Sequence, residues 1–120
     1  ETRQSGQTYH RGQGQDGVDV YMAYLLGRSY VGMRAEDTLA AARWLATELP
    51  GTKIHLHAHG ALTVSAQHAA YVEPDLIALL TLSSPPPTWT EVVQSGRSPD
   101  QLQNAVHGAL RAYRLSDLDR

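Results

Sequence analysis

The sequence has no cysteine and no phenylalanine, and its eight aromatic residues are six Tyr and two Trp. The lack of Cys excludes a disulfide framework and a thiolate metal site. No apolar run approaches the ~20 residues that a membrane-spanning helix needs, so we predict no membrane partner. Ten Lys and Arg oppose twelve Asp and Glu, giving a formal net charge of −2. This balance lacks the positive charge that binding to nucleic-acid phosphates requires, which predicts no nucleic-acid partner.

The composition that is present suits one globular domain. The chain has 120 residues, of which 42% are hydrophobic and 18% charged, unlike a charge-driven disordered chain. Residues 1–17 differ, because they are rich in Gln, Gly, Ser and Thr and contain only one large apolar residue, Tyr9. We therefore predict a flexible N-terminal arm over 1–17 and an α/β domain over 18–120.

Three segments have helical patterns. Residues 18–26 are apolar and end at Gly27, residues 31–49 end at Pro50, and residues 62–72 form the third pattern. In the second segment, apolar side chains recur with the helical period and predict one inward face. Its members are Ala35, Leu39, Ala42, Ala46 and Leu49.

Two segments have strand patterns. Residues 53–59 alternate, and residues 76–82 form a continuous apolar run of the kind that suits a parallel strand covered on both faces. A strand–helix–strand unit of this spacing predicts parallel strands. Two interior-type strands make no stable sheet alone. We therefore expect the rest of a longer chain, or a second subunit, to complete the sheet.

The last third of the chain begins with a rigid loop over 83–87. A short helix is predicted over 89–93. Ser98 and Pro99 resemble a helix start and predict a further helix over 101–111. Its inward positions are Leu102, Val106 and Leu110.

Several strings in this chain resemble one enzyme family. They are GRSYVGMRAED over 27–37, QHAAYVEPDL over 67–76 and NAVHGALRAYRLSDL over 104–118. Together they resemble bacterial acetyl xylan esterases and dienelactone hydrolase-like proteins of the α/β-hydrolase superfamily. The resemblance implies a partial three-layer α/β-hydrolase-like (Rossmann-type) fold and a small-molecule or carbohydrate ester as substrate. It also implies a bacterial protein, cytoplasmic or exported. We expect the chain to be a middle-to-late slice of a fold about two to three times longer.

The turn between residue 59 and the helix at 62 is where such hydrolases hold their nucleophile. By the resemblance, the nucleophile position falls on Ala61, or on His59 in an alternative register. Neither is Ser, Cys or Asp, and Thr63 and Ser65 fall inside the predicted helix. The implied acid and base lie on later segments, and His107 does not match the triad histidine. The chain is thus predicted to be a fragment or a degenerate member, or a non-catalytic binding or structural module.

Three histidines alternate along the first predicted strand. His55, His57 and His59 would project from one face, where imidazoles can bind a metal such as Zn²⁺. The string IHLHAHG also resembles the H-x-H strand of metal-dependent amidohydrolases, which makes a metal-dependent hydrolase a third hypothesis. That fold needs further ligands and a TIM barrel of ~250 residues. The alternative is a row of ordinary strand histidines satisfied by local hydrogen bonds.

Charged residues gather around Gly32, and two tryptophans stand elsewhere. The charged residues are Arg28, Arg34, Glu36 and Asp37. They predict an ion-pair anchor at a helix start, with binding of a substrate carboxylate by an arginine as the alternative. Trp44 and Trp89 suit either stacking on sugars or packing in the core or a lid.

Overall fold

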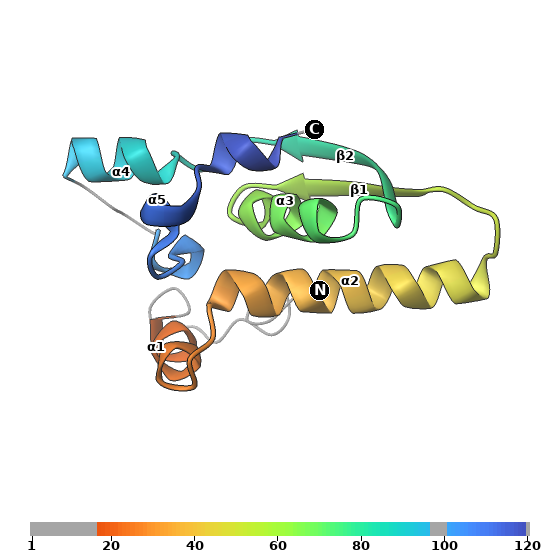
Figure 1. Cartoon of the computed structure of the whole chain (residues 1–120), viewed down its shortest axis with the longest axis horizontal. Helices are drawn as coiled ribbons and strands as arrows, with labels where there is room; N and C mark the ends of the chain where they lie inside the picture. The colour runs from red at the N-terminus through yellow and green to blue at the C-terminus, as the bar shows by residue number, and fades with distance from the viewer. Residues whose placement is uncertain (1–16, 97–100, 120) are drawn as a thin grey trace.

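The computed structural model describes residues 17–96 and 101–119 of an α/β protein with a two-stranded parallel sheet and flanking helices. Its helices and strands are α1 Gly17–Leu25, α2 Tyr30–Glu48, β1 Ile54–His59, α3 Leu62–Val72, β2 Ile77–Ser83, α4 Trp89–Ser95 and α5 Ala109–Ala112 (Figure 1). Two 3-10 turns, η2 Leu102–Asn104 and η3 Leu115–Leu118, flank α5. The predicted arm over 1–17, except Gly17, and the predicted helix start at 98–100 lie outside the described residues.

Helix α2 confirms the strongest helical prediction. The Ser29 hydroxyl caps its start by accepting a hydrogen bond from the Gly32 backbone N–H at 2.9 Å. The predicted inward face is confirmed in its first half, where Leu39 is 5% exposed, and wrong at Leu49, which is 53% exposed. Figure 1 shows that α2 continues past the end of α3, so its last turn lies beyond the helix that covers its first half.

The connection β1–α3–β2 confirms the predicted parallel unit. The register pairs His57 with Thr81 and His59 with Ser83, and it shifts once, between Ile54 and His55. In the view of Figure 1, α3 lies between α2 and the two strands. The carboxyl ends of both strands point to the end of the molecule that carries α4 and α5 (Figure 1).

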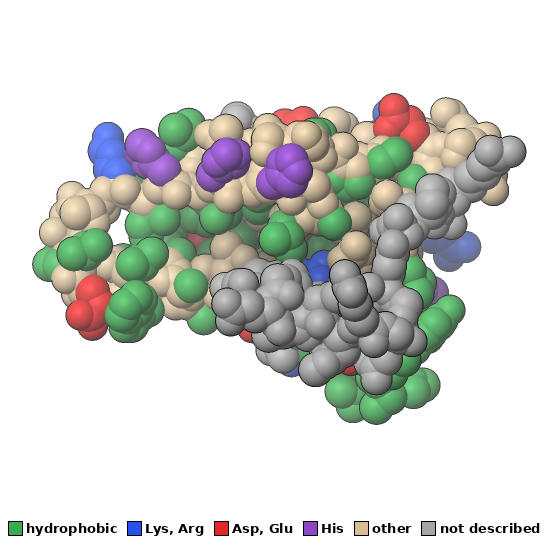
Figure 2. Space-filling model, turned by 180° about the vertical axis from the view of Figure 1, so that it is seen from behind, with side chains coloured by type: hydrophobic (Ala, Val, Ile, Leu, Met, Phe, Trp, Pro, Cys, Tyr) green, Lys and Arg blue, Asp and Glu red, His purple; other side chains and the backbone are tan. Residues whose placement is uncertain are grey.

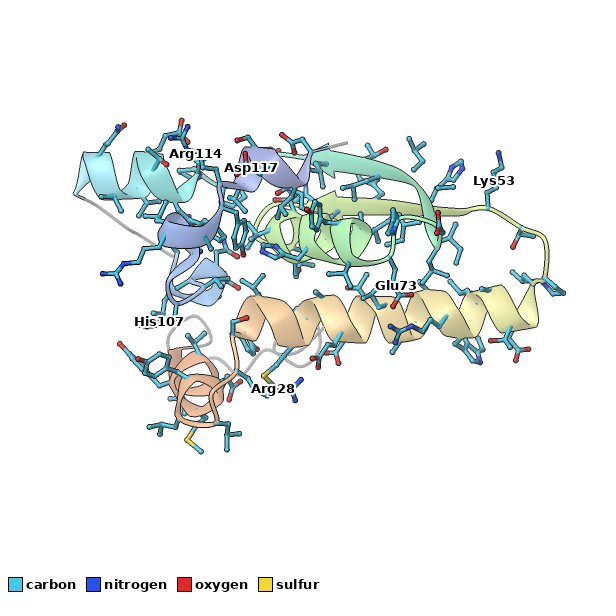
Figure 3. All side chains as sticks on the ribbon, in the orientation of Figure 1. Arg28, Lys53, Glu73, His107, Arg114 and Asp117 are labelled. Atoms are coloured by element: carbon cyan, nitrogen blue, oxygen red, sulfur yellow. The ribbon has the colours of Figure 1, made fainter. Side chains whose placement is uncertain are left out.

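Two apolar clusters hold these elements together. One joins α2, α3 and the strands and contains Ala35, Leu39, Ala69 and Ile77. The other joins α2 and α3 to the C-terminal segment and contains Val31, Val64, Leu115 and Leu118. At the surface, Arg43 of α2 forms an ion pair with Glu73, which Figure 3 shows at the end of α3 facing α2. Helix α3 therefore contacts α2, both strands and η3.

The helix predicted over 101–111 is wrong. Ala105 is extended and Gly108 has a left-handed φ of 76°, so the segment breaks into η2 and α5. The Trp89 indole N–H donates to the Asn104 carbonyl at 2.9 Å, which supplies a partner outside any helix. The predicted inward residues Leu102 and Leu110 are exposed.

In the described part of the chain, the sheet has two unpaired strand edges and one exposed face. It contains β1 and β2 only, so both outer strand edges lack a neighbour there. Leu79 of β2 is 50% exposed, although the apolar run predicted a strand covered on both faces. Among the helices of residues 17–96 and 101–119, none has the length and apolar character needed to cross a bilayer.

Candidate functional site

The turn from β1 into α3 has the sharp strand-to-helix geometry that the sequence predicts. Gly60 has a left-handed φ of 61°, and Ala61 follows in helical conformation, at φ −59°. Residues with side chains rarely adopt a left-handed φ, which explains a glycine here. The sharpest position is thus one residue before Ala61, and it has no side chain.

The two hydroxyls at the start of α3 point into the protein. Thr63 Oγ1 donates to the Gly60 carbonyl at 2.8 Å, and Ser65 Oγ donates to the Leu62 carbonyl at 3.0 Å. Both residues are buried within α3, as predicted. Neither hydroxyl is free to attack a bound ester at the turn.

The three histidines of β1 form a row on the exposed face of the sheet. The alternation predicted this arrangement. Figure 2, which views the molecule from the side opposite to Figure 1, shows the row at the surface. The Nε2 atom of His57 lies 3.2 Å from Ser83 Oγ, and the Nδ1 atom of His59 lies 3.0 Å from the same oxygen. His55 lies opposite Leu79, which offers no polar partner. The structure therefore brings together two of the three predicted ligands, with a serine that the sequence did not single out.

Ser83 occupies the carboxyl end of β2, beside the β1–α3 turn. Its carbonyl accepts a hydrogen bond from the Gly60 N–H at 3.0 Å, so the two strand ends are tied together. Ser84 follows with a left-handed φ of 51°, an uncommon conformation for serine that turns the chain away from the sheet. Ligands of open α/β sheets bind outside the carboxyl ends of the strands. This end of the sheet is the candidate site.

The predicted three-histidine group does not gather around a point. In the part of the chain that the structure describes, no three His, Asp or Glu side chains lie close enough to hold a metal ion among them. His55 stays apart because its cross-strand partner is Leu79, whereas Ser83 lies at the other end of the strand pair. The convergence at Ser83 involves only His57 and His59.

The charged residues around Gly32 have separate partners. Arg28 and Glu36 form an exposed ion pair, and Figure 3 shows Arg28 at the link between α1 and α2. Arg34 is only 2% exposed, and its guanidinium donates to Gln103 Oε1 at 2.8 Å and lies 4.4 Å from the centre of the Tyr30 ring. These contacts favour the anchor interpretation over binding of a substrate carboxylate by Arg34.

The two tryptophans have different surroundings. Trp44 is 61% exposed, whereas the Trp89 ring packs edge-on against Tyr113 at 5.5 Å. Beside Trp89 lies an apolar groove of about 480 Å³ between α4 and the 101–111 segment. His107 lies outside this groove's lining and packs its ring against Tyr24 at 5.6 Å.

The fold lowers the pKa of His68, a partly buried residue of α3. Its Nδ1–H donates to the Val64 carbonyl at 2.7 Å, so Nε2 accepts from the Tyr113 hydroxyl at 2.6 Å. Burial lowers the pKa of His68 because it penalises the charged imidazolium, and the Val64 carbonyl opposes this in part. Burial also raises the pKa of Tyr113. The pair is therefore held neutral, linking α3 to the C-terminal segment.

We expect acid to destabilise the protein through His68. The unfolded chain takes up a proton near the ordinary pKa of 6.5, and the folded chain does so only at lower pH. The stability from neutral His68 is thus present above pH 6.5 and is lost as the pH falls below it. Urea unfolding at pH 7.5 and pH 5.0 measures the loss, which should be smaller in His68→Gln.

The exposed His107 supplies the control. The His107→Gln variant should keep the full acid dependence of the parent protein. Equal acid dependence in His68→Gln and the parent would contradict the prediction. If His68→Gln does not fold, an NMR titration of His68 in the parent protein serves instead, with a pKa at or above the ordinary value as the contrary result.

Comparison with known proteins found no match to this chain among protein families, curated proteins or solved structures.

Proposed function

We propose that this chain is an α/β-hydrolase-type module, related to bacterial carboxylic ester hydrolases, that carries no nucleophile at its strand-to-helix turn. The observation that supports it is the order of the elements: β1 leads through a sharp turn into α3, and β2 then pairs parallel to β1. Gly60 has the left-handed φ at this turn. In the hydrolase fold the nucleophile lies on a sharp strand-to-helix turn of this kind, which by the resemblance corresponds to Ala61, or to His59 in the alternative register. The family resemblance of the flanking segments supports the same proposal.

The module would then act by binding or by supporting other parts of a protein. An ester hydrolase needs a nucleophile, a base and an oxyanion site together. Here the turn offers Gly60 and Ala61, and the hydroxyls of Thr63 and Ser65 in the first turn of α3 donate to backbone carbonyls. By the resemblance, the ligand class is a small-molecule or carbohydrate ester.

The proposal also includes further strands beside β1 and β2. Open strand edges invite pairing with another segment. In the described residues both edges of the sheet are unpaired, and Leu79 is exposed. We propose that the rest of a longer chain or a second subunit supplies these strands.

An ester assay tests the catalytic part of the proposal. With p-nitrophenyl acetate, the chain should show no saturable turnover, because histidines in water give only a slow reaction that rises linearly with substrate. The His59→Ala and Ala61→Gly variants should behave like the parent. Ser65→Ala is the control for a buried hydroxyl. Saturable turnover that is lost in a turn variant would overturn the proposal.

A further inference from the structure

Two imidazoles and one hydroxyl converge at the carboxyl end of the sheet. The distances from Ser83 Oγ are 3.2 Å to Nε2 of His57 and 3.0 Å to Nδ1 of His59. The hydroxyl also donates a long hydrogen bond of 3.4 Å to the Ala58 carbonyl. Two nitrogens from β1 and one oxygen from β2 therefore surround one small volume.

This donor set has the chemistry of a transition-metal site. Neutral imidazole is the commonest protein ligand for such ions, and residues i and i+2 of a strand lie on the same face. Ligand atoms at ~2.0–2.1 Å from a tetrahedral ion lie roughly 3.3 Å apart, close to the nitrogen-to-oxygen distances of 3.2 and 3.0 Å found here. The two rings are exposed, so a small adjustment around an ion displaces no packed side chain.

We propose that His57, His59 and Ser83 bind a late first-row transition-metal ion, with water in the remaining coordination positions. Two nitrogens and no carboxylate favour Cu²⁺, Ni²⁺ or Zn²⁺ over Mg²⁺ or Ca²⁺. The inference uses only these three side chains and does not rest on the hydrolase-type proposal.

The position in the fold gives the site access and a structural effect. The histidine row lies on the exposed face of the sheet (Figure 2). His59 and Ser83 are cross-strand partners, so a bound ion links β1 to β2. Because an ion that binds only the folded state stabilises it, binding raises the melting temperature.

Calorimetric titration of the full chain, produced without a histidine tag, with NiCl₂ tests the site. The expected result is one ion per chain. His57→Ala and His59→Ala should each weaken binding about tenfold or more. His55→Ala is the matched control, because it removes an exposed histidine of the same row that does not contact Ser83; its binding should change less than about twofold. Ser83→Ala should weaken binding by an intermediate factor.

Three results would overturn the proposal. One is the absence of saturable Ni²⁺ binding by the parent chain. Another is an equal loss in His55→Ala and His59→Ala, which would assign binding to the row as a whole. The third is unchanged binding in the double variant of His57 and His59, which would place the ion at another histidine. Circular dichroism of each variant checks that the fold is kept, and unchanged binding in Ser83→Ala would remove the serine from the site.

Discussion

Replacing Leu39 with alanine is expected to lower the free energy of unfolding by about 2–5 kcal/mol. Leu39 is 5% exposed and packs with Ala35, Ala69 and Ile77, where α2, α3 and β2 meet. Alanine would lose the transfer free energy of the removed methyl groups and leave a cavity. The surrounding residues cannot fill this cavity, because two of them are alanines, whose side chains are too short to reach into it.

The matched variant is Leu49→Ala, at the residue that directly follows the last turn of α2. Leu49 is 53% exposed, so the same substitution should cost less than about 1 kcal/mol. Urea unfolding followed by circular dichroism gives both values. Similar losses in the two variants would mean that α2 is buried along its whole length. If Leu39→Ala does not fold, Leu39→Met should give a loss below about 1.5 kcal/mol.

Replacing Arg34 with alanine is the second change with a large expected effect, about 2–5 kcal/mol of unfolding free energy. The guanidinium is buried, donates to Gln103 and lies over the Tyr30 ring. A hydrogen bond to a charged group contributes about 1.5–3 kcal/mol, and a desolvated cation–π contact adds about 0.5–2 kcal/mol. Removing the side chain loses both and leaves the Gln103 oxygen without this donor.

Arg43→Ala is the control for this experiment. The Arg43 side chain is 59% exposed, and Glu73 raises the pKa of its guanidinium by hydrogen bonding and by charge. Exposed ion pairs contribute little to stability, so this variant should unfold almost like the parent. Arg34→Lys should fall between the two, because lysine keeps the charge but lacks the planar fork. An Arg34→Ala variant as stable as Arg43→Ala would show that the buried contacts contribute nothing net.

Local patterns in the sequence predict most of the helices and both strands. The helices over 18–26, 31–49 and 62–72 follow from period and stop signals that act within a few residues. The segment 101–111 fails because its conformation depends on distant contacts: Trp89 binds the Asn104 carbonyl, and Gly108 adopts a left-handed φ. The spacing of apolar residues within 101–111 reveals neither the hydrogen bond from Trp89 nor the backbone conformation of Gly108.

The sequence predicts the histidines of the candidate site but not its serine. Alternation within β1 is local, and it correctly predicts that His55, His57 and His59 share one face. The contribution of Ser83 depends on the register between β1 and β2, which is fixed by the length of the α3 crossover and by the shift at Ile54. A serine shortly before a run of three prolines is typical of a loop in the sequence, although in the fold Ser83 ends the strand.

The short β1–α3–β2 connection has a consequence for the order of folding. Loop-closure entropy grows only with the logarithm of loop length, and residues 60–76 form a short loop. Pairing of parallel strands is usually a slow, non-local step of folding, but here it requires only a small loss of loop-closure entropy. The cluster of Val64 with Leu115 and Leu118 joins residues far apart in the chain. We expect the strand–helix–strand unit to form first and the C-terminal segment to dock onto it last.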